Sequence, residues 1–206
     1  MKRSPRFTLA ILLLLSALLS ACASAPQATR QLYDLGPAPA LVAADRRAPI
    51  SFVLADIQVA PVLDNNAMLY RLQYDNLQQL KPYAQTRWSM APAQLLNQRF
   101  RTLFVAHGER VLSPGDGQPQ LPVVRIDLDE FSQVFSSPAN SEARLQFRVA
   151  VIRQHQLIAQ RNWLVQVPAV SADAGGGARA MQEASDRAFN ELRQWLHTLP
   201  LNPPSP

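Results

Sequence analysis

Few side chains in this sequence could carry chemistry, and their spacing limits what that chemistry could be. The chain has a single cysteine, Cys22, and three histidines, His107, His155 and His197. No two histidines stand at the spacing of metal ligands. One cysteine cannot form a disulfide within a chain. The sequence therefore predicts no metal site, no bound cofactor and no internal disulfide.

The segment before Cys22 has the three parts of a secretory signal. Basic residues at positions 2, 3 and 6 precede an apolar run of 13 residues, 7–19. As a helix this run would be about 20 Å long, whereas the core of a bilayer is about 30 Å thick. A charged start, a short apolar middle and small residues at the end are typical of a signal peptide rather than of a membrane span.

Cys22 stands where a lipid could be attached. The residues Leu19-Ser20-Ala21-Cys22 resemble the bacterial lipobox, in which the cysteine thiol is joined to diacylglycerol and the chain is cut just before it. We therefore predict a lipoprotein signal peptide over 1–21, cleavage between Ala21 and Cys22, and lipid attachment at Cys22. The alternative is an ordinary signal peptide that happens to be followed by a cysteine, although a free thiol is unusual in an exported protein.

Lipidation would anchor the protein to a membrane without a membrane span. Each buried CH₂ contributes about 0.8 kcal/mol, so two or more acyl chains such as palmitate give a stable anchor. Residues 22–31 are predicted to form a lipidated tether, and the eight residues after Cys22 reach at most about 28 Å. In Gram-negative lipoproteins, an aspartate directly after the cysteine usually holds the protein at the inner membrane. Ala23 stands at this position here, so by that sorting rule we expect the periplasmic face of the outer membrane.

Length and charge indicate one globular domain and no nucleic-acid partner. Removal of the predicted signal peptide leaves 185 residues, enough for one domain with a sizeable core. These residues include 17 basic and 15 acidic side chains, a net charge of +2, because three of the 20 basic residues lie in the signal peptide. Nucleic-acid binding needs a strongly basic stripe, which this balance does not support.

Hydrophobic periodicity predicts an α/β fold after the signal peptide. The predicted elements are strands over 31–35, 50–59, 109–113, 123–135, 141–154 and 157–167, a hairpin of strands 68–74 and 77–83, and helices over 91–105 and 178–198. Short polar breaks between the last three strands favour an antiparallel meander, with a bulge near Asp129-Glu130 where the apolar phase shifts. We expect a single three-layer-like domain at 32–199, with a mixed or antiparallel sheet packed by two main helices, and a disordered tail at 200–206.

Two groups of polar or flexible residues could suggest catalysis or ligand binding. Asp127, Asp129 and Glu130 could be catalytic carboxylates, but Asp127 and Asp129 alternate with apolar residues and more simply form the wet face of a half-buried strand. Gly175–Gly177 could cradle a phosphate at the start of a helix, but no P-loop lysine follows, so a flexible joint is the simpler interpretation. No Gly-x-Ser-x-Gly turn is present. We expect no enzyme, with an envelope hydrolase using Asp127 or His155 as the alternative.

The order of these elements resembles the ABC-type transport auxiliary lipoprotein family, the PqiC-like outer-membrane lipoproteins, over nearly all of the mature chain. A lipobox leads into Leu32-Tyr33-Asp34-Leu35, and a strand then runs into Ala60-Pro61-Val62-Leu63-Asp64. The segment from Val59 to Asp64 and the Arg87-Trp88 step before a Leu-rich helix carry the match. The acidic residue often found after that step is replaced here by Ala93-Gln94.

The resemblance implies a non-enzymatic, three-layer α/β domain that serves a transport system for lipid or organic solvent. The implied partners are an ABC ATPase, its permease and a membrane-anchored MCE-domain protein, with a homo-oligomer as a further expectation. A structural lipoprotein that assists another outer-membrane machine is the alternative. Because exposed aromatic residues are favoured in interfaces, the expected partner surface comprises Tyr70, Tyr74, Tyr83 and Trp88. Burial of Trp88 beneath the first helix is the alternative for that residue.

Overall fold

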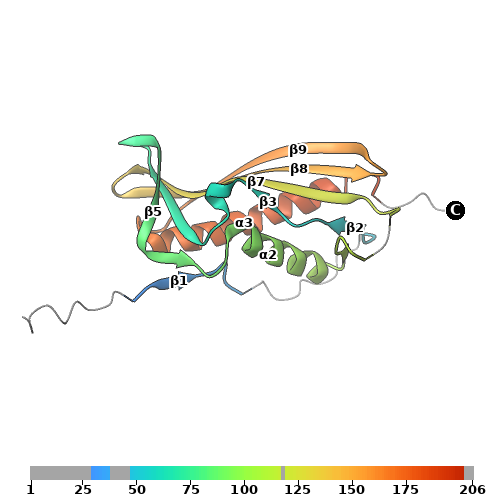
Figure 1. Cartoon of the computed structure of the whole chain (residues 1–206), viewed down its shortest axis with the longest axis horizontal. Helices are drawn as coiled ribbons and strands as arrows, with labels where there is room; N and C mark the ends of the chain where they lie inside the picture. Colours follow the sequence, from blue (N-terminus) through green and yellow to red (C-terminus); the bar gives the residue numbers. More distant parts are fainter. Residues whose placement is uncertain (1–28, 38–46, 117–118, 202–206) are drawn as a thin grey trace, which may run out of the picture. The chain divides into compact units, whose positions relative to one another are not determined.

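The computed structural model describes residues 29–37, 47–116 and 119–201 (Figure 1). The predicted signal peptide and Cys22 lie outside these residues. The elements in chain order are β1 (Gln31–Tyr33), β2 (Ser51–Leu54), β3 (Gln58–Val59), the 3-10 helix η1 (Pro61–Leu63), β4 (Ala67–Leu72), β5 (Asn76–Trp88), α2 (Pro92–Ala106), β6 (Arg110–Leu112), β7 (Val123–Ser137), β8 (Asn140–Arg153), β9 (Gln156–Pro168) and α3 (Ala174–Leu196).

The long strand β7 is the centre of a mixed sheet. One edge of β7 pairs antiparallel with β8, which pairs antiparallel with β9, so the predicted meander is confirmed. The other edge of β7 pairs in parallel with β2, β3 and β4 in succession. The pairing of β7 with β8 shifts register between Leu128 and Glu130, which confirms the predicted bulge.

Strands β4 and β5 form the predicted antiparallel hairpin, which extends the sheet beyond β7. Its tip, residues 73–79, begins beside the end of β7, because the Gln73 N–H donates to the Phe135 carbonyl at 2.9 Å. The short strand β1 pairs in parallel with the last residues of β5, from Gln31 opposite Thr86 to Tyr33 opposite Trp88. The first strand of the domain, β1, therefore joins the sheet at the edge formed by β5.

Both helices pack on the same face of the sheet, below the meander in Figure 1. Strand β8 alternates buried and more exposed residues along its length, as expected for a strand with one covered face. Aromatic rings join the layers: Phe104 of α2 contacts Phe52 of β2 and Phe189 of α3, with ring centroids 5.0 and 4.8 Å apart. The α/β class with two main helices on a mixed sheet is confirmed. The described residues form two layers, because no described helix covers the opposite face.

The predicted strand 50–59 is divided into β2 and β3. Leu54 pairs with Val124 and Gln58 with Asp127, so the chain places one extra residue here relative to β7. Such an insertion leaves residues unpaired and bends the strand. Asp56, in this interruption, accepts a hydrogen bond from Asn97 of α2 at 2.9 Å, so the bend brings a polar side chain against the helix.

The two ends of the domain also differ from the expected boundaries. Helix α3 begins at Ala174 and includes all three glycines of 175–177, so the predicted flexible joint is wrong. Gln31, assigned to the tether, lies in β1. Leu201, assigned to the disordered tail, is buried, and its carbonyl accepts a hydrogen bond from Arg153 at 2.7 Å. The described fold therefore includes Gln31 at one end of the domain and Leu201 at the other.

Candidate functional site

The histidines and carboxylates singled out from the sequence are dispersed over the domain. His155 lies in the exposed turn between β8 and β9, and His107 ends α2 with its Nδ1 2.8 Å from the Leu103 carbonyl. Nowhere in the described ranges do three or more His, Cys, Asp or Glu side chains gather as metal ligands would. Within the described residues, the histidines therefore build no metal-ligand cluster.

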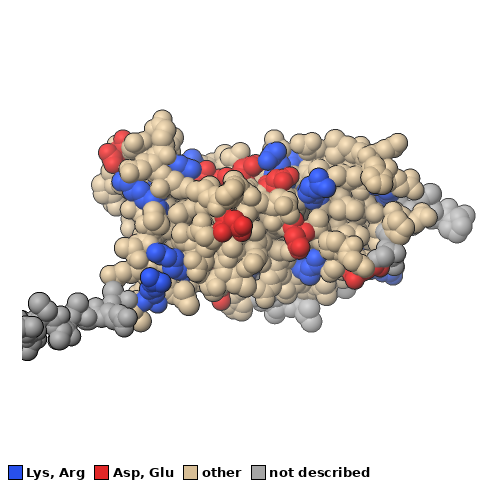
Figure 2. Space-filling model, in the orientation of Figure 1, with Lys and Arg blue, Asp and Glu red and all other residues tan. Residues whose placement is uncertain are grey.

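Two of the three carboxylates of β7, Asp129 and Glu130, are held in ion pairs on the open face of the sheet, and the third, Asp127, is half-buried. Asp129 accepts from Arg148 at 3.0 Å, and Glu130 accepts from Arg71 at 3.0 Å and from Ser132 at 2.6 Å. The hydrogen bond to Asp129 and its charge raise the pKa of Arg148. Figure 2 shows positive and negative side chains interspersed over the face in view, without a large patch of one sign. This arrangement fits the solvated strand face that the alternation predicted.

A buried carboxylate joins the far ends of three elements. The side chain of Glu109 is 1% exposed and accepts from Arg193 at 2.8 Å and from the Ile50 N–H at 2.8 Å. His197 Nε2 lies 2.7 Å from the same carboxylate. A glutamate beside a histidine could be a catalytic pair, but no substrate can reach a group this deeply buried. The cluster therefore stabilises the junction of β2, β6 and α3.

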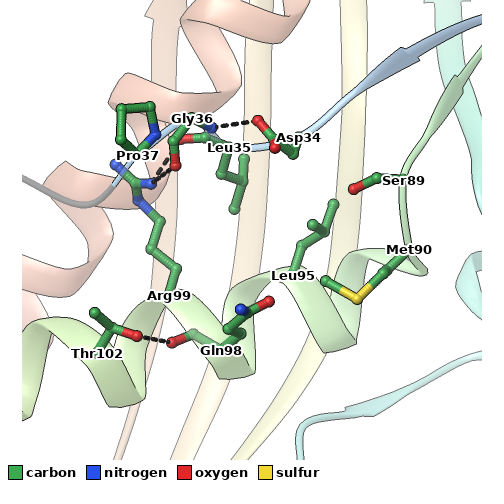
Figure 3. A pocket seen from close by; sticks show the side chains of 10 residues that line it. All are labelled: Asp34, Leu35, Gly36, Pro37, Ser89, Met90, Leu95, Gln98, Arg99 and Thr102. Carbon is green, nitrogen blue, oxygen red and sulfur yellow. Dashed lines mark hydrogen bonds between the residues drawn. The ribbon is translucent and has the colours of Figure 1, made fainter.

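A second buried cation holds the segment that follows β1. Arg99 of α2 makes two hydrogen bonds to Asp186 of α3, at 2.6 and 2.8 Å. Its Nη1 donates to the carbonyls of Leu35 and Gly36 at 2.6 and 3.2 Å. Figure 3 shows Arg99 reaching from the helix to this backbone, at the side of a hollow of about 320 Å³. Every nitrogen of the guanidinium group is engaged, so Arg99 acts as a structural clamp and leaves little capacity for a ligand.

Two of the four aromatic residues expected at a partner surface pack against each other. The rings of Tyr70 and Tyr83 lie 4.7 Å apart, and Tyr70 also contacts Phe135. The Tyr83 hydroxyl donates to Gln133 at 2.9 Å. Burial, followed by the proximity of Tyr70 and Asp173, raises the pKa of Tyr83 above its ordinary value. These tyrosines mainly fasten the hairpin to β7.

The other two aromatic residues are separated from this pair. Trp88 is only 2% exposed and packs edge-on against Phe131, with ring centroids 5.3 Å apart. Its position corresponds to the buried alternative, so Trp88 does not belong to an accessible surface. Tyr74 is exposed at the hairpin tip, together with Leu77. Of the four residues, Tyr74 presents the most open aromatic surface.

A mostly apolar hollow of about 500 Å³ lies at the opposite end of the meander, where β7 begins and β8 ends. Leu121, Val123 and Ile152 line it, and His155 stands at its side. Among the described residues that line this hollow, no aspartate, glutamate or second histidine stands beside His155 to act with it in acid–base catalysis.

In the part of the chain that the structure describes, no helix is long and apolar enough to cross a membrane.

Comparison with known proteins identifies the family of this domain. The family model of the ABC-type transport auxiliary lipoprotein component matches residues 33–192, from β1 into the last helix. The chain belongs to this family. The family match confirms the resemblance seen in the sequence, and it implies a membrane-associated lipoprotein that assists an ABC-type transporter. The ABC-type transport auxiliary lipoprotein family is not a known enzyme family.

Solved structures support the fold of this auxiliary lipoprotein. It is similar to protein XCC0632 from Xanthomonas campestris, of family DUF330, with a TM-score of 0.69 and 17% identity over 81% of this chain and 94% of that one. A second, uncharacterized protein gives a TM-score of 0.59 and 13% identity, over 82% of this chain and 99% of the other. No curated protein sequence matches. At these identities the similarity supports the fold alone.

Sequence reasoning missed Arg99, Glu109 and Asp186, which hold distant parts of the auxiliary lipoprotein together. Arg99 and Asp186 are 87 residues apart, so neither periodicity nor a short motif could link them. One signal was available for Arg99, because its position on α2 coincides with the buried stripe that includes Leu96, Phe100 and Leu103. An arginine on such a stripe requires a buried acceptor.

Proposed function

We propose that this protein is a non-enzymatic lipoprotein of the outer membrane, and that it is the auxiliary component of an MCE-linked ABC system for lipid or organic-solvent transport. The observation that carries the proposal is the family match over 33–192 directly after a lipobox and a short tether. The match supports the transport-auxiliary role, and the lipobox supports the anchor. The MCE link comes from the resemblance of the element order to the PqiC-like lipoproteins.

The lipid would be carried by Cys22, after cleavage between Ala21 and Cys22. Support comes from its position behind the apolar run and from its being the only cysteine in the chain. Because Ala23 follows it, we place the anchor in the outer membrane, with the domain on the periplasmic side. Acyl chains that include palmitate would then hold the protein at the membrane.

A passive role agrees with the chemistry of the domain. Asp129 and Glu130 of β7 are in ion pairs, the Glu109 carboxylate is inaccessible, and Arg99 is saturated by its partners. Catalytic groups need access to substrate and a second group positioned to work with them. We therefore propose that the protein acts by binding an MCE-domain protein and, through it, the permease and ATPase, as a single copy or a homo-oligomer.

A comparison of the parent with Cys22→Ser tests this proposal. We expect the parent to incorporate labelled palmitate and to sediment with outer membranes, whereas Cys22→Ser stays unlabelled, keeps its signal peptide and no longer sediments with outer membranes. After mild cross-linking and detergent extraction, the parent is expected to yield an MCE-domain protein identified by mass spectrometry. A variant processed and located like the parent would remove the anchor from the proposal. Recovery of a labelled parent without any MCE-domain protein would contradict the transport partner and favour another outer-membrane assembly.

A further inference from the structure

We propose that one end of the domain, defined by the hairpin tip (73–79) and the loop 169–173, contacts the lipid surface of the membrane that holds the tether. The contact residues are Leu32, Tyr74, Leu77 and Val170. This inference rests on the proposed lipidation of Cys22 and extends it, because it assigns a membrane contact to the folded domain itself.

Hydrogen bonds place these segments at the same end of the sheet. The hairpin tip begins at Gln73, which is bonded to Phe135 near the end of β7. The loop after β9 begins at Ala169, whose N–H donates to the carbonyl of Ser141 near the start of β8. The same loop ends at Asp173, whose carbonyl accepts from Gln133 of β7 at 3.1 Å. The tip and the loop therefore flank the turn between β7 and β8.

This end exposes apolar side chains from separate segments. Tyr74 and Leu77 on the tip are 48% and 41% exposed, and Val170 on the loop is 80% exposed. Leu32 of β1, 66% exposed, lies near the start of α3, because Leu32 and Gly175 line a common hollow. Tyrosine, with an apolar ring and a polar tip, is favoured at the boundary between lipid and water. Four exposed apolar side chains on one end form a surface suited to that boundary.

The direction of β1 indicates why this end would meet lipid. Because β1 runs parallel to β5 and Gln31 stands opposite Thr86, the start of β1 points along β5 toward the hairpin tip. From Thr86 back to Asn76 the strand extends about 33 Å at most. The eight residues between Cys22 and the domain reach about 28 Å at most. A lipid on Cys22 would therefore keep the start of β1 within about 28 Å of the membrane, a distance comparable to the length of the hairpin.

Charge near the tip favours an apolar contact over an electrostatic one. Two basic side chains lie at the tip, and each has an acidic neighbour. Lys81 lies 3.8 Å from Asp75. Arg71, which donates to the Leu77 carbonyl at 3.2 Å, is paired with Glu130 at 3.0 Å. A site for anionic lipid would need an excess of basic side chains. We therefore assign the contact to the interfacial layer of a phospholipid bilayer, reached by the exposed apolar residues, rather than to an anionic headgroup.

Site-directed spin labelling of the lipidated full-length chain tests this contact. Because Cys22 would be consumed by lipid, a cysteine introduced elsewhere is the only thiol that a nitroxide reagent can label. Tyr74→Cys and Val170→Cys place the label at the proposed contact. Leu157→Cys, next to the turn at the opposite end of the meander, and Leu164→Cys, in the middle of β9, are matched controls, because those leucines are 59% and 55% exposed.

The readout is the collision of each nitroxide with oxygen and with a water-soluble nickel chelate, in vesicles of phosphatidylethanolamine and phosphatidylglycerol. We expect nickel collisions at positions 74 and 170 to be several-fold lower than at 157 and 164, with oxygen collisions unchanged or higher. Equal nickel collisions at all four positions would overturn the inference. So would shielding at position 74 that arises only after an MCE-domain protein is added, since the tip would then bind protein.

The parent chain separates failure of this inference from failure of the proposed anchor. If Cys22 carries lipid, the parent takes up no nitroxide, and the collision data then decide the membrane contact alone. Labelling of the parent at Cys22 would contradict the lipidation itself, and with it the basis of this inference. The circular dichroism of each variant should equal that of the parent, because all four substituted side chains are exposed.

Discussion

Asp173 illustrates how one residue fixes the start of an element. It occupies the N-cap of α3 with extended backbone angles, and its carboxylate accepts from the Gly176 N–H at 2.6 Å and from the Ser171 hydroxyl at 3.0 Å. An N-cap carboxylate satisfies a backbone donor that the first turn leaves free and interacts favourably with the helix dipole. The hydrogen bond from Gly176, followed by that from Ser171, holds the pKa of Asp173 below its ordinary value of 3.8.

Replacement of Asp173 by alanine should therefore have a pH-dependent cost. At neutral pH we expect Asp173→Ala to lower the free energy of unfolding by about 1 kcal/mol, a typical value for a lost N-cap. Because the folded-state pKa is lowered, the carboxylate contributes fully above pH 3.8, and the contribution is lost as the pH falls through the folded-state value. The measurement is urea unfolding of parent and variant across this range. Asp173→Asn, which retains an acceptor, is the control, and a difference independent of pH would contradict the assignment.

At the scale of elements, the start of α3 shows why a glycine run can be rigid. Glycine is unfavourable inside helices, which is why the sequence favoured a flexible joint at 175–177. In the structure, a Cβ on Gly176 would stand 2.1 Å from the Ser171 carbonyl oxygen, and a Cβ on Gly177 would stand 2.0 Å from the Gln133 Oε1. The Gln133 side chain is held by Tyr83 and Ser141. The glycines therefore allow α3 to approach the sheet closely.

Alanine substitutions should separate close packing from helix propensity. Gly176→Ala and Gly177→Ala are expected to lower the free energy of unfolding by about 1–3 kcal/mol, because overpacking outweighs the gain in propensity. Gly175→Ala is the matched control: its Cβ would meet the movable Tyr33 hydroxyl at 3.2 Å, so we expect a change below about 1 kcal/mol. Urea unfolding measures all three. Equal effects at the three positions would mean that propensity alone governs this turn.

Periodicity predicted the elements that have one buried face. The meander, the hairpin and α2 follow from alternation or a helical stripe, and α2 differs from its prediction by one residue at each end. Periodicity could not predict the partners of each strand. The parallel pairing of β1 with β5 and the division of β2 from β3 depend on contacts with strands distant in sequence. The same reason explains why Trp88 is buried rather than part of the predicted aromatic surface. It packs against Phe131, a residue distant in sequence.

At the scale of the whole molecule, Arg99 connects parts that would otherwise be joined only by packing. It links α2 to α3 through Asp186, and both helices to the segment after β1 through the carbonyls of Leu35 and Gly36. The side chain of Arg99 is 4% exposed and that of Asp186 is 29% exposed. Removal of the arginine would leave a partly hydrated carboxylate and two carbonyls without their donor.

Arg99→Met should destabilise the domain strongly. Breaking a buried ion pair from one side costs about 3–5 kcal/mol, and we expect the lower end because Asp186 is partly hydrated. The control is Arg187→Met. It removes an exposed ion pair within α3, between Arg187 and Glu183, and should lower the free energy of unfolding by less than about 1 kcal/mol. Urea unfolding gives both values. In Arg99→Met, amide hydrogen exchange should become faster in β1, while β7 and β8 should remain better protected than β1. Similar losses for the two variants would show that Arg99 has no special role.

The parallel pairing of β1 with β5 has a mechanical consequence for a domain held by its N-terminus. Tension on the chain before Gln31, directed along the strand, would load the hydrogen bonds between β1 and β5 in shear, so that they resist together rather than peel apart one by one. Beyond β1, the same load reaches the backbone of Leu35 and Gly36, where Arg99 passes it to both helices. A drag on the tether would thus be borne at the margin of the fold before it reached the meander.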